Sequence, residues 1–351
     1  MDIHVENNID RIDRDQWNAL ARQNPVNTVF QTFEFNRAAQ AAYGRGDGSF
    51  ILCVKDKGRL IAIFPLLFTK VNGKRTLQFM AGERSDYCDL ICPQQREEVL
   101  EMVWACILSR RREWDIVHLS NIPLETSLAR YMKENKDLKR LVHRSSQDEA
   151  VYLRFKEDQA HTQEVLSKKK VLGFRRYFQT HGGYRVLHLH RSQDIAGYLE
   201  DFFAQHIKRW QGSLYPSLFL DEVNKEFYRC MVQGLPQGWI TFTVIQFKDH
   251  ILGYHLGFSY GKSFVWYKPT FNKVFGQHSP GQVLLQEVME YANAQGFEEF
   301  DLGVGKDPYK HRFGNKVRRN NSFKVFSSRG AYLCYYIPLA IQWRVSRLFA
   351  K

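Results

Sequence analysis

The sequence predicts an α/β fold with mixed sheets, arranged as two halves that repeat one order of elements. Hydrophobic periodicity gives each half a strand, two helices, three antiparallel strands, a helix and a final strand. The second half closes with a strand, a loop, a helix and a strand, which is the order of a parallel crossover unit. A chain of 351 residues also exceeds the usual size of one domain. We therefore expect two α/β domains in tandem.

In the first half, alternating apolar and polar residues on both sides of Asp56-Lys57-Gly58 predict a β-hairpin. Helical spacing of apolar residues appears before and after this hairpin. The predicted strands span 3–5, 49–55, 59–68, 75–81 and 114–119, and the predicted helices span 14–23, 32–43 and 94–111.

The second half begins with a strand and a basic segment, 158–181, that ends at Gly182-Gly183. The basic face of this segment is either solvated or turned toward an acidic or phosphate-bearing ligand. A second hairpin is predicted around Lys248-Asp249-His250. The predicted strands span 151–155, 184–190, 239–247, 251–260, 263–268 and 300–302, and the predicted helices span 194–211, 221–233 and 279–295.

The joint between the halves is predicted near residues 145–149. We expect an N-terminal domain at 1–148, a C-terminal domain at 149–330 and a basic, amphipathic tail helix at 331–351. This tail either docks on the body of the protein or lies on an anionic membrane surface, which would make a peripheral contact at the inner face of a membrane.

The composition favours a folded protein with an anionic partner. Hydrophobic residues make up 44% of the chain, which excludes a disordered protein, and the formal charge is +13 with a pI of about 9.4. Nucleic acid, a membrane surface and a phosphate-bearing cofactor all remain open. The six cysteines form no C-x-x-C pair, so we expect reduced thiols, no metal and a cytoplasmic location.

The segment 300–313 gathers acids, a phenol and cations behind a short buried strand. Loops at the end of a rigid strand are where binding and catalytic residues are often placed. The candidate residues are Asp301, Asp307, Tyr309 and Lys310. For Asp301 a turn-capping role, and for Tyr309 and Lys310 a buried structural pair, are the competing interpretations.

The helix predicted at 279–295 begins with features that suit an anion. Ser279 is a good N-cap, Pro280 suits the first turn, and Gln282 completes a capping box. Capping alone would explain these residues. The alternative is that Gly276 and Gly281 let an anionic group reach bare backbone N–H donors, as a pyrophosphate would. The preceding loop adds Lys273, Gln277 and His278, but its spacing is neither a Walker A loop nor a dinucleotide fingerprint.

At these residues the chain resembles GNAT acyltransferases of the CelD/BcsL-like type, which are associated with cellulose and exopolysaccharide synthesis, and the related Fem-type transferases with two GNAT-like domains. The resemblance extends to about Arg329, although the loop is less glycine-rich than the GNAT pattern Q/R-x-x-G-x-G/A. The matching residues are Phe30-Gln31-Thr32, Phe35, Pro65-Leu66, Ser85-Asp86-Tyr87, Asp89, the helix 167–176, His206, Arg209-Trp210, Trp266-Tyr267, Ser279-Pro280-Gly281, Asp301-Leu302-Gly303 and Tyr309-Lys310.

The resemblance implies two tandem GNAT-like domains, each with a mostly antiparallel sheet and a splayed parallel strand pair. It implies that the pantetheine arm of acyl-CoA lies between the splayed strands, beside Trp266-Tyr267, and that the loop 273–281 binds the pyrophosphate. Amine acylation then needs a base, for which Asp301 comes first, with Asp307 or His206 next. Tyr309 would protonate the leaving thiolate, and Lys310 would hold an anionic group.

Two further groups are expected to bind the acceptor. His206, Arg209 and Trp210 share one helical face, so they either line a cleft or, for His206, form a packed structural site. In the first half, Asp86, Tyr87 and Asp89 occupy the position that corresponds to the pyrophosphate loop. Because these residues are acidic rather than glycine-rich, we expect this half to have lost cofactor binding and to bind an amine or sugar acceptor.

The leading hypothesis is therefore a cytoplasmic N-acyltransferase. It would move an acetyl or longer acyl group from acyl-CoA, most simply acetyl-CoA, to an amine of an amino sugar, an amino-acid-like compound or an envelope polysaccharide precursor. A second hypothesis keeps the fold and takes aminoacyl-tRNA as the donor. A third is a non-enzymatic basic module that binds nucleic acid or an anionic membrane.

Overall fold

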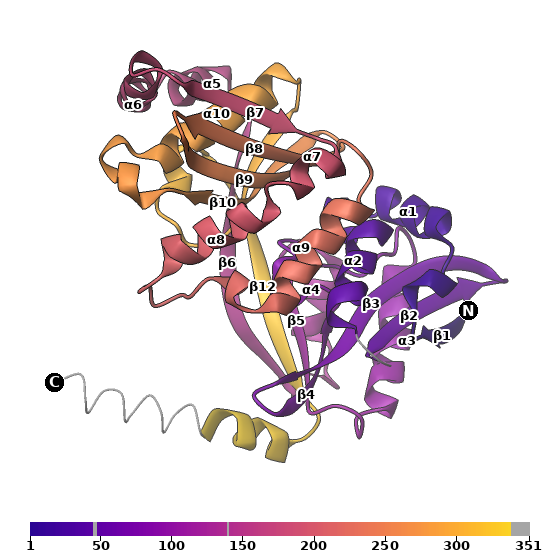
Figure 1. The fold of residues 1–351 in the computed structure, drawn as a ribbon. Helices are drawn as coiled ribbons and strands as arrows, with labels where there is room; N and C mark the ends of the chain where they lie inside the picture. The colour runs from indigo at the N-terminus through magenta and orange to yellow at the C-terminus, as the bar shows by residue number, and fades with distance from the viewer. Residues whose placement is uncertain (45–47, 139, 338–351) are drawn as a thin grey trace. The chain divides into compact units, whose positions relative to one another are not determined.

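The computed structural model describes residues 1–44, 48–138 and 140–337, and the chain divides into two compact units (Figure 1). Unit 1 comprises 1–36, 43–148 and the residues from 319 onward, whereas unit 2 comprises 37–42 and 149–318. The predicted joint at 145–149 lies inside a long strand, β6 (Val142–Arg154), rather than in a loop. Residues 319–330, which we expected in the second domain, cluster with unit 1.

Unit 1 contains a mixed sheet in the order β1-β2-β3-β4-β5-β12. The pairings are antiparallel except β4 with β5, which is parallel over Thr76–Gln78 and Ile116–His118. The sequence analysis did not predict β12. The strands are β1 (Asp2–Glu6), β2 (Ser49–Asp56), β3 (Arg59–Val71), β4 (Lys74–Phe79), β5 (Ile116–Pro123) and β12 (Lys316–Phe326).

Four α-helices occur in the described residues up to 138, and residues 37–42 of the second of them cluster with unit 2. Asp13 caps the first by accepting from the N–H of Gln16, and the indoles of Trp104 and Trp114 lie in the core that the third helix covers. The sequence analysis missed the fourth, which Thr126 caps. The helices are α1 (Arg14–Gln23), α2 (Phe33–Tyr43), α3 (Arg96–Ser109) and α4 (Ser127–Glu134).

Unit 2 contains a second mixed sheet in the order β6-β11-β10-β9-β8-β7. Only β10 and β11 run parallel, and they pair over just three positions, Ser263–Val265 with Glu299–Asp301. Beyond Val265, β10 continues without this partner and its register with β9 is interrupted by a bulge before Lys268. The new strands are β7 (Tyr184–Leu189), β8 (Ile240–Phe247), β9 (His250–Tyr260), β10 (Ser263–Phe271) and β11 (Glu299–Val304).

Helices cover both faces of the unit 2 sheet. Phe202 of α8 meets Phe242 of β8 edge to face, whereas Ile245 belongs to the core beneath α10. Side chains alternate between the faces of a strand, so these contacts place α8 and α10 on opposite faces. The helices are α5 (Gln159–Leu166), α6 (Lys169–Thr180), α7 (Ser192–Ala196), α8 (Leu199–Trp210), α9 (Glu222–Gly234) and α10 (Pro280–Ala294).

Two segments that we predicted as single helices are each divided. The basic segment 158–181 forms α5 and α6, which break at Ser167 and Lys168. The segment 194–211 forms α7 and α8, with Gly197 and Tyr198 between them. In the tail, residues 329–337 are helical, and residues 338–351 lie outside the described residues.

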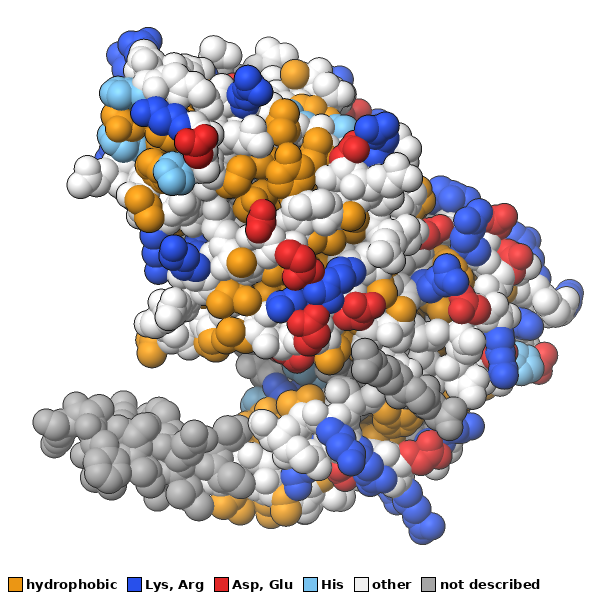
Figure 2. Space-filling view, viewed as in Figure 1, with side chains coloured by type: hydrophobic (Ala, Val, Ile, Leu, Met, Phe, Trp, Pro, Cys, Tyr) orange, Lys and Arg blue, Asp and Glu red, His pale blue; other side chains and the backbone are white. Residues whose placement is uncertain are grey.

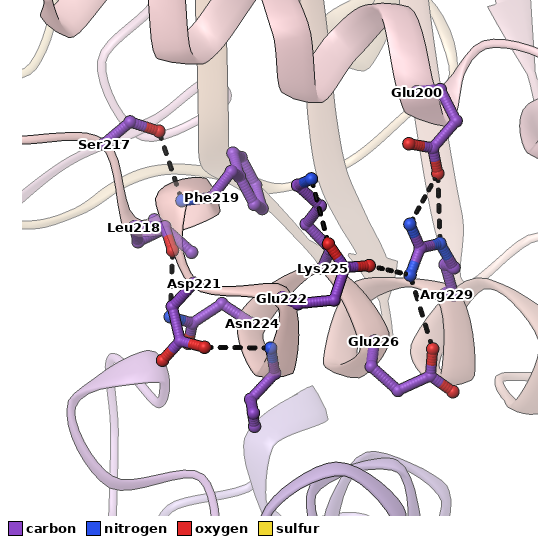
Figure 3. A network of polar contacts seen from close by, with 11 residues as sticks. Glu200, Ser217, Leu218, Phe219, Asp221, Glu222, Asn224, Lys225, Glu226 and Arg229 are labelled. Carbon is purple, nitrogen blue, oxygen red and sulfur yellow. Dashed lines mark hydrogen bonds and ion pairs between the residues drawn. The ribbon is translucent and has the colours of Figure 1, made fainter.

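A surface charge network joins α9 to α8 (Figure 3). The guanidinium of Arg229 donates to Glu200 at 2.7 Å and to Glu222 at 2.7 Å, with Glu226 at 3.4 Å. Figure 2 shows these blue and red side chains gathered on the face that carries α9. Because Glu200 and Glu222 are exposed, each of these pairs contributes little stability by itself.

A buried ion pair in unit 1 offers a test of this packing. Arg96 donates to Asp89 and to the carbonyls of Leu90 and Cys92, and Asp89 is fully buried. Arg96→Met would leave that carboxylate unpaired, so urea-induced unfolding should show a loss of about 3–5 kcal/mol in the free energy of unfolding. Arg130→Met, which removes an exposed pair with Glu97, should cost no more than about 1 kcal/mol. Equal losses for both variants would contradict a special role for the buried pair.

Candidate active site

The most informative cavity of unit 2 lies where β10 and β11 part. It has a volume of about 310 Å³ and opens to solvent. Strand β10, the loop that follows it, the first turns of α10 and the loop after β11 all contribute walls, and α8 contributes one arginine. The lining residues are Arg209, Trp266, Pro269, Phe271, Gly276, Ser279, Pro280, Gly281, Gln282, Leu285, Tyr309 and Arg312.

The start of α10 forms one end of this cavity. Ser279 precedes the helix in the left-handed region, with φ 43° and ψ 57°, and its side chain makes no capping hydrogen bond. The predicted capping box is therefore wrong, although Pro280 does occupy the first turn as expected. The N–H of Gly281 has no acceptor among the described residues, since the recorded bonds to Ser279 O come from Gln282 and Val283. A helix start with a bare donor attracts anions.

Gly281 is also required sterically. A Cβ atom at this position would lie 2.6 Å from the ring of Phe271, closer than real Cβ contacts come. The Phe271 ring in turn lies 4.1 Å beneath the guanidinium of Arg209, within cation–π distance. Arg209 also donates to the carbonyl of Pro269 at 2.9 Å. These contacts hold an arginine and an aromatic ring against the helix start.

A second, more basic cavity of about 420 Å³ adjoins the first and shares Arg209 and Phe271 with it. Lys208 of α8 and Lys273 of the loop both line it, and both are exposed. The predicted loop residue Lys273 thus borders this second cavity rather than the first. Two lysines and an arginine give this side of the site a positive potential.

The indole of Trp266 and the phenol of Tyr309 form a pair in the first cavity. Trp266 donates its Nε1–H to the Tyr309 hydroxyl oxygen at 3.1 Å. Burial raises the pKa of Tyr309 to about 12, so the phenol keeps its proton at neutral pH. Because the oxygen accepts from Trp266, the O–H of Tyr309 remains a donor for a group in the cavity. The structure thus brings together two residues that we predicted separately.

Asp301 and Lys310 are buried and committed to the loop itself. The carboxylate of Asp301 accepts from the N–H of Gly303 at 2.7 Å and pairs with Arg318 at 3.4 Å. The ammonium of Lys310 donates to the carbonyls of Gly303 and Val304 at 3.1 and 2.9 Å. Neither residue lines the cavity. The turn-capping role that competed for Asp301 matches its bond to Gly303. Lys310 is buried, as the alternative of a buried structural Tyr309–Lys310 pair requires, but these hydrogen bonds join it to backbone carbonyls.

Asp307 differs from Asp301 because it is exposed. Its carboxylate lies 3.8 Å from Lys310 Nζ, and its side chain is 57% accessible. A carboxylate at the surface of this loop can meet an incoming amine, whereas a carboxylate buried under the loop cannot.

His206 lies in an aromatic core rather than at the cavity. Its Nδ1 lies 2.8 Å from the Ser217 hydroxyl, and its ring contacts Phe219 edge to face. Burial lowers the pKa of His206 to about 3. Its ring is packed in this core and lies outside the cavity lining, so the geometry favours the packed structural histidine. Its helical neighbour Trp210 is half-buried, and Arg209 alone of this group reaches the cavity.

Three more predicted cofactor residues lie outside the lining of the first cavity. His278 stacks face to face on Tyr177 of α6, with ring centroids 3.5 Å apart. Gln277 is exposed. Tyr267 is buried and stacks on Tyr228 of α9. His278 and Tyr267 therefore fix the loop and strand that carry the lining residues.

The acidic residues of unit 1 lie in a closed environment. Asp89 is fully buried, and burial raises its pKa to about 6 against the opposing effect of Arg96. Tyr87 is also buried, and its ring lies 6.2 Å from that of Phe30. Asp86 is half-buried, and its carbonyl accepts from Asn320. Asp89 thus has a structural partner, which the sequence could not reveal.

Sequence reasoning missed several lining residues, including Pro269, Phe271 and Leu285. Phe271 begins the predicted loop 271–278 and has no polar group to mark it, and Leu285 has the spacing of an ordinary core residue. Arg312 was noted only as part of the charged loop. The one available signal was Gly281, whose missing side chain reflects a ring that must lie against it.

Two searches of the described ranges 1–44, 48–138 and 140–337 gave negative results. No group of three or more His, Cys, Asp or Glu residues there is arranged to hold a metal ion. No helix within those ranges has the length and apolar character needed to cross a bilayer.

Comparison with known proteins agrees with the cavity's position. Residues 167–311 match the family model described as an acetyltransferase (GNAT) domain. This segment contains β10, the loop, α10, β11 and Tyr309. The chain has a GNAT-type acyltransferase fold. A comparison with curated proteins found no match.

Solved structures extend the similarity over nearly the whole chain. FemX superposes with a TM-score of 0.59 at 10% identity, covering 93% of this chain and 97% of that one. A tandem GNAT protein from the clavulanic acid biosynthesis pathway gives 0.56 at 13% identity, covering 93% and 98%. The C-terminal domain of a protein named as a lysylphosphatidylglycerol synthetase, from Agrobacterium fabrum, gives 0.57 at 11%, covering 93% and 95%. At these identities the similarity concerns the fold alone.

The buried histidines predict acid sensitivity. Burial lowers the pKa of His118 and His188 to about 4 and that of His206 to about 3, below the unfolded value of 6.5. A depressed folded pKa contributes stability that is present above pH 6.5 and lost as the pH falls toward the folded value. Urea titrations from pH 7 to pH 4 should show a falling free energy of unfolding, and His206→Gln should reduce the slope. Asp89 acts in the opposite direction but is a single group. A free energy of unfolding that does not change between pH 7 and pH 4 would contradict the prediction that these histidines are neutral in the folded protein.

Proposed function

We propose that the protein is an acyl-CoA-dependent N-acyltransferase whose thioester lies in the cavity between β10 and β11. The observation that carries this proposal is the combination of a short parallel pairing and a bare helix start. The two strands pair only as far as Val265 and Asp301, and Gly281, whose N–H has no acceptor among the described residues, lines the cavity. A parted strand pair admits an extended amide-containing arm, and a bare helix start suits its phosphate end.

The charges around the cavities fit a polyanionic donor. Arg209 and Arg312 line the first cavity, and Lys208 and Lys273 border or line the second. These cations lie within one unit and surround one aromatic ring, that of Phe271. A pyrophosphate near Gly281 would thus meet both backbone N–H and side-chain donors.

Tyr309 is the residue that we assign to the leaving group. The amine nitrogen attacks the thioester carbonyl carbon, a C–N bond forms, and the C–S bond breaks as the intermediate collapses. The thiolate then takes the proton of Tyr309, which is protonated at neutral pH before the reaction, and the tyrosinate that remains regains a proton from solvent. Burial raises the pKa of Tyr309 to about 12, so this return of the proton is favourable. The guanidinium of Arg209 faces the charge that develops in the cavity.

Asp307 is our assignment for the base that takes the amine proton. Asp301 came first on sequence grounds, but its carboxylate is occupied by Gly303 and Arg318. Asp307 is exposed on the same loop and needs no rearrangement to meet an amine. The proposed acceptor is an amino sugar, an amino-acid-like compound or a polysaccharide precursor, and these classes share a primary amine.

Gly281→Leu tests the position of the donor. The new side chain would collide with the ring of Phe271 and fill the helix start, so calorimetry should show acetyl-CoA binding weakened by at least about tenfold. Gly173→Leu is the matched control, because Gly173 is also helical and nothing lies within 4 Å of its missing Cβ. If the wild-type protein does not bind acetyl-CoA or longer acyl-CoAs, the proposal is wrong.

The same calorimetry separates the alternatives. Binding of tRNA that weakens steeply with added salt, without any acyl-CoA binding, would favour the aminoacyl-tRNA donor or a basic binding module. The resemblance of the sequence to Fem-type transferases, which gave the aminoacyl-tRNA hypothesis, is why tRNA belongs among the ligands tested.

Tyr309→Phe tests the proton donor. It removes the hydroxyl but keeps the ring, so kcat for release of CoA from acetyl-CoA should fall about 10²- to 10⁴-fold, while KM for acetyl-CoA changes little. Tyr198→Phe is the control, since Tyr198 is half-buried in the same unit and lies outside the cavity. A Tyr309→Phe enzyme with wild-type kcat would exclude this role.

A further inference from the structure

His255 of β9 lies behind the cavity and is fully buried. Its Nε2 accepts the backbone N–H of Tyr267 at 3.3 Å, inside the bulge of β10. A nitrogen that accepts an N–H carries no proton, so this bond makes His255 the neutral tautomer with hydrogen on Nδ1. The His255 side chain is thus an acceptor for the Tyr267 N–H at the bulge, where the regular pairing of β10 with β9 is interrupted.

The surrounding backbone leaves space for this imidazole at the expense of another side chain. A Cβ at Gly257 would lie 2.2 Å from His255 Cε1 and 2.7 Å from the carbonyl of Val265. Residues two apart on a strand face the same side of the sheet. The His255 ring therefore occupies the space that a side chain at position 257 would need. The histidine at 255 can be accommodated because residue 257 is a glycine.

The imidazole also stacks on a residue of the cavity. The rings of His255 and Trp266 are nearly parallel, at 12°, with centroids 4.1 Å apart. Trp266 donates a hydrogen bond from its Nε1–H to the hydroxyl oxygen of Tyr309 at 3.1 Å. His255, Trp266 and Tyr309 therefore form a continuous series of contacts from the centre of the sheet to the cavity.

A merely space-filling residue would not need a polar ring at this position. The Nδ1 atom of His255 is buried without a hydrogen-bond partner among the described residues, which is unfavourable. Burial also holds the pKa of His255 well below its ordinary value, so the ring does not exchange protons near neutrality. The one polar task that the ring performs is to accept from Tyr267.

We propose that His255 is a positioning residue for acyl transfer: it holds the β10 bulge through the Tyr267 amide and fixes the Trp266 indole that orients the Tyr309 hydroxyl. This inference rests on the function proposed above for Tyr309. It assigns His255 no contact with the thioester and no proton transfer. Its effect on the reaction passes through the backbone of the β10 bulge and the Trp266 indole that this backbone carries.

The first experiment is independent of catalysis. In protein labelled with ¹⁵N, the hydrogen bond predicts a scalar coupling between the Tyr267 amide nitrogen and His255 Nε2, with the proton on Nδ1. In protein labelled with ¹³C-tyrosine, His255→Phe should move the Tyr309 Cζ resonance. His188→Phe is the matched control: His188 is another histidine of this sheet, bonded to Thr243 and stacked on Tyr291. It should leave Tyr309 unchanged.

The second experiment uses acetyl-CoA with glucosamine as the probe acceptor. His255→Phe keeps a ring against Trp266 but removes the acceptor for Tyr267, so kcat should fall about 10- to 100-fold while KM for acetyl-CoA stays within about threefold. His255→Gln restores an acceptor oxygen and should recover most of this loss. His188→Phe should retain the wild-type kcat.

The outcomes distinguish this inference from the function on which it rests. A wild-type protein that neither binds nor turns over acetyl-CoA overturns the proposed function, while the coupling and the Tyr309 resonance still report on the positioning contacts. A missing coupling, an unmoved Tyr309 resonance in His255→Phe, or equal kcat losses in His255→Phe and His188→Phe would overturn the role of His255.

Discussion

The feature on which the candidate site depends is the brevity of the parallel pairing between β10 and β11. Three pairs, ending at Val265 and Asp301, anchor the strands, and then β10 bulges and continues to Phe271 without this partner. A bulge increases local twist and interrupts the ladder, so the backbone itself opens the gap. The helix that follows must then begin beside this gap, which places Gly281 at its mouth.

The opening is kept from collapsing by charges buried on the β11 side. Asp301 and Glu299 share Arg318, which also lies 3.9 Å from the ring of Tyr152. Lys310 binds the two carbonyls where β11 ends. Removing one partner of a buried pair leaves an uncompensated charge, so these residues hold the loop in one conformation. In the function proposed above, these residues present Tyr309 instead of taking the direct roles that the sequence suggested for them.

The sequence predicted the order of the elements well because strand alternation and helix caps are local properties. The helix 14–23 and the hairpin around Asp56-Lys57-Gly58 appear as expected. It did not predict β12, because the first seven residues of this strand, KVRRNNS, contain a single apolar side chain and resemble a surface loop. Nor could the sequence show that Asp301 is paired while Asp307 is exposed. The partner of Asp301 is Arg318, which lies 17 residues away in the chain. Neighbouring residues in the sequence were enough to indicate the loop that carries the candidate site. They could not show which side chains of that loop are paired with residues farther along the chain.

The two units differ in the loop that follows the first strand of their parallel pairs. Strands β4 and β5 also pair in parallel over three positions, so unit 1 repeats the geometry of β10 and β11. In unit 1, however, the loop after β4 is closed by the chain itself. Asn121 donates to the carbonyl of Ser85 and accepts from the N–H of Cys88, and Arg96 neutralises the buried Asp89. In unit 2 the corresponding helix start keeps a bare N–H beside a cavity. The parallel strand pair is thus followed by a loop bonded to its own chain in unit 1 and by an open cavity in unit 2. A duplicated domain that retained a single site would show this difference.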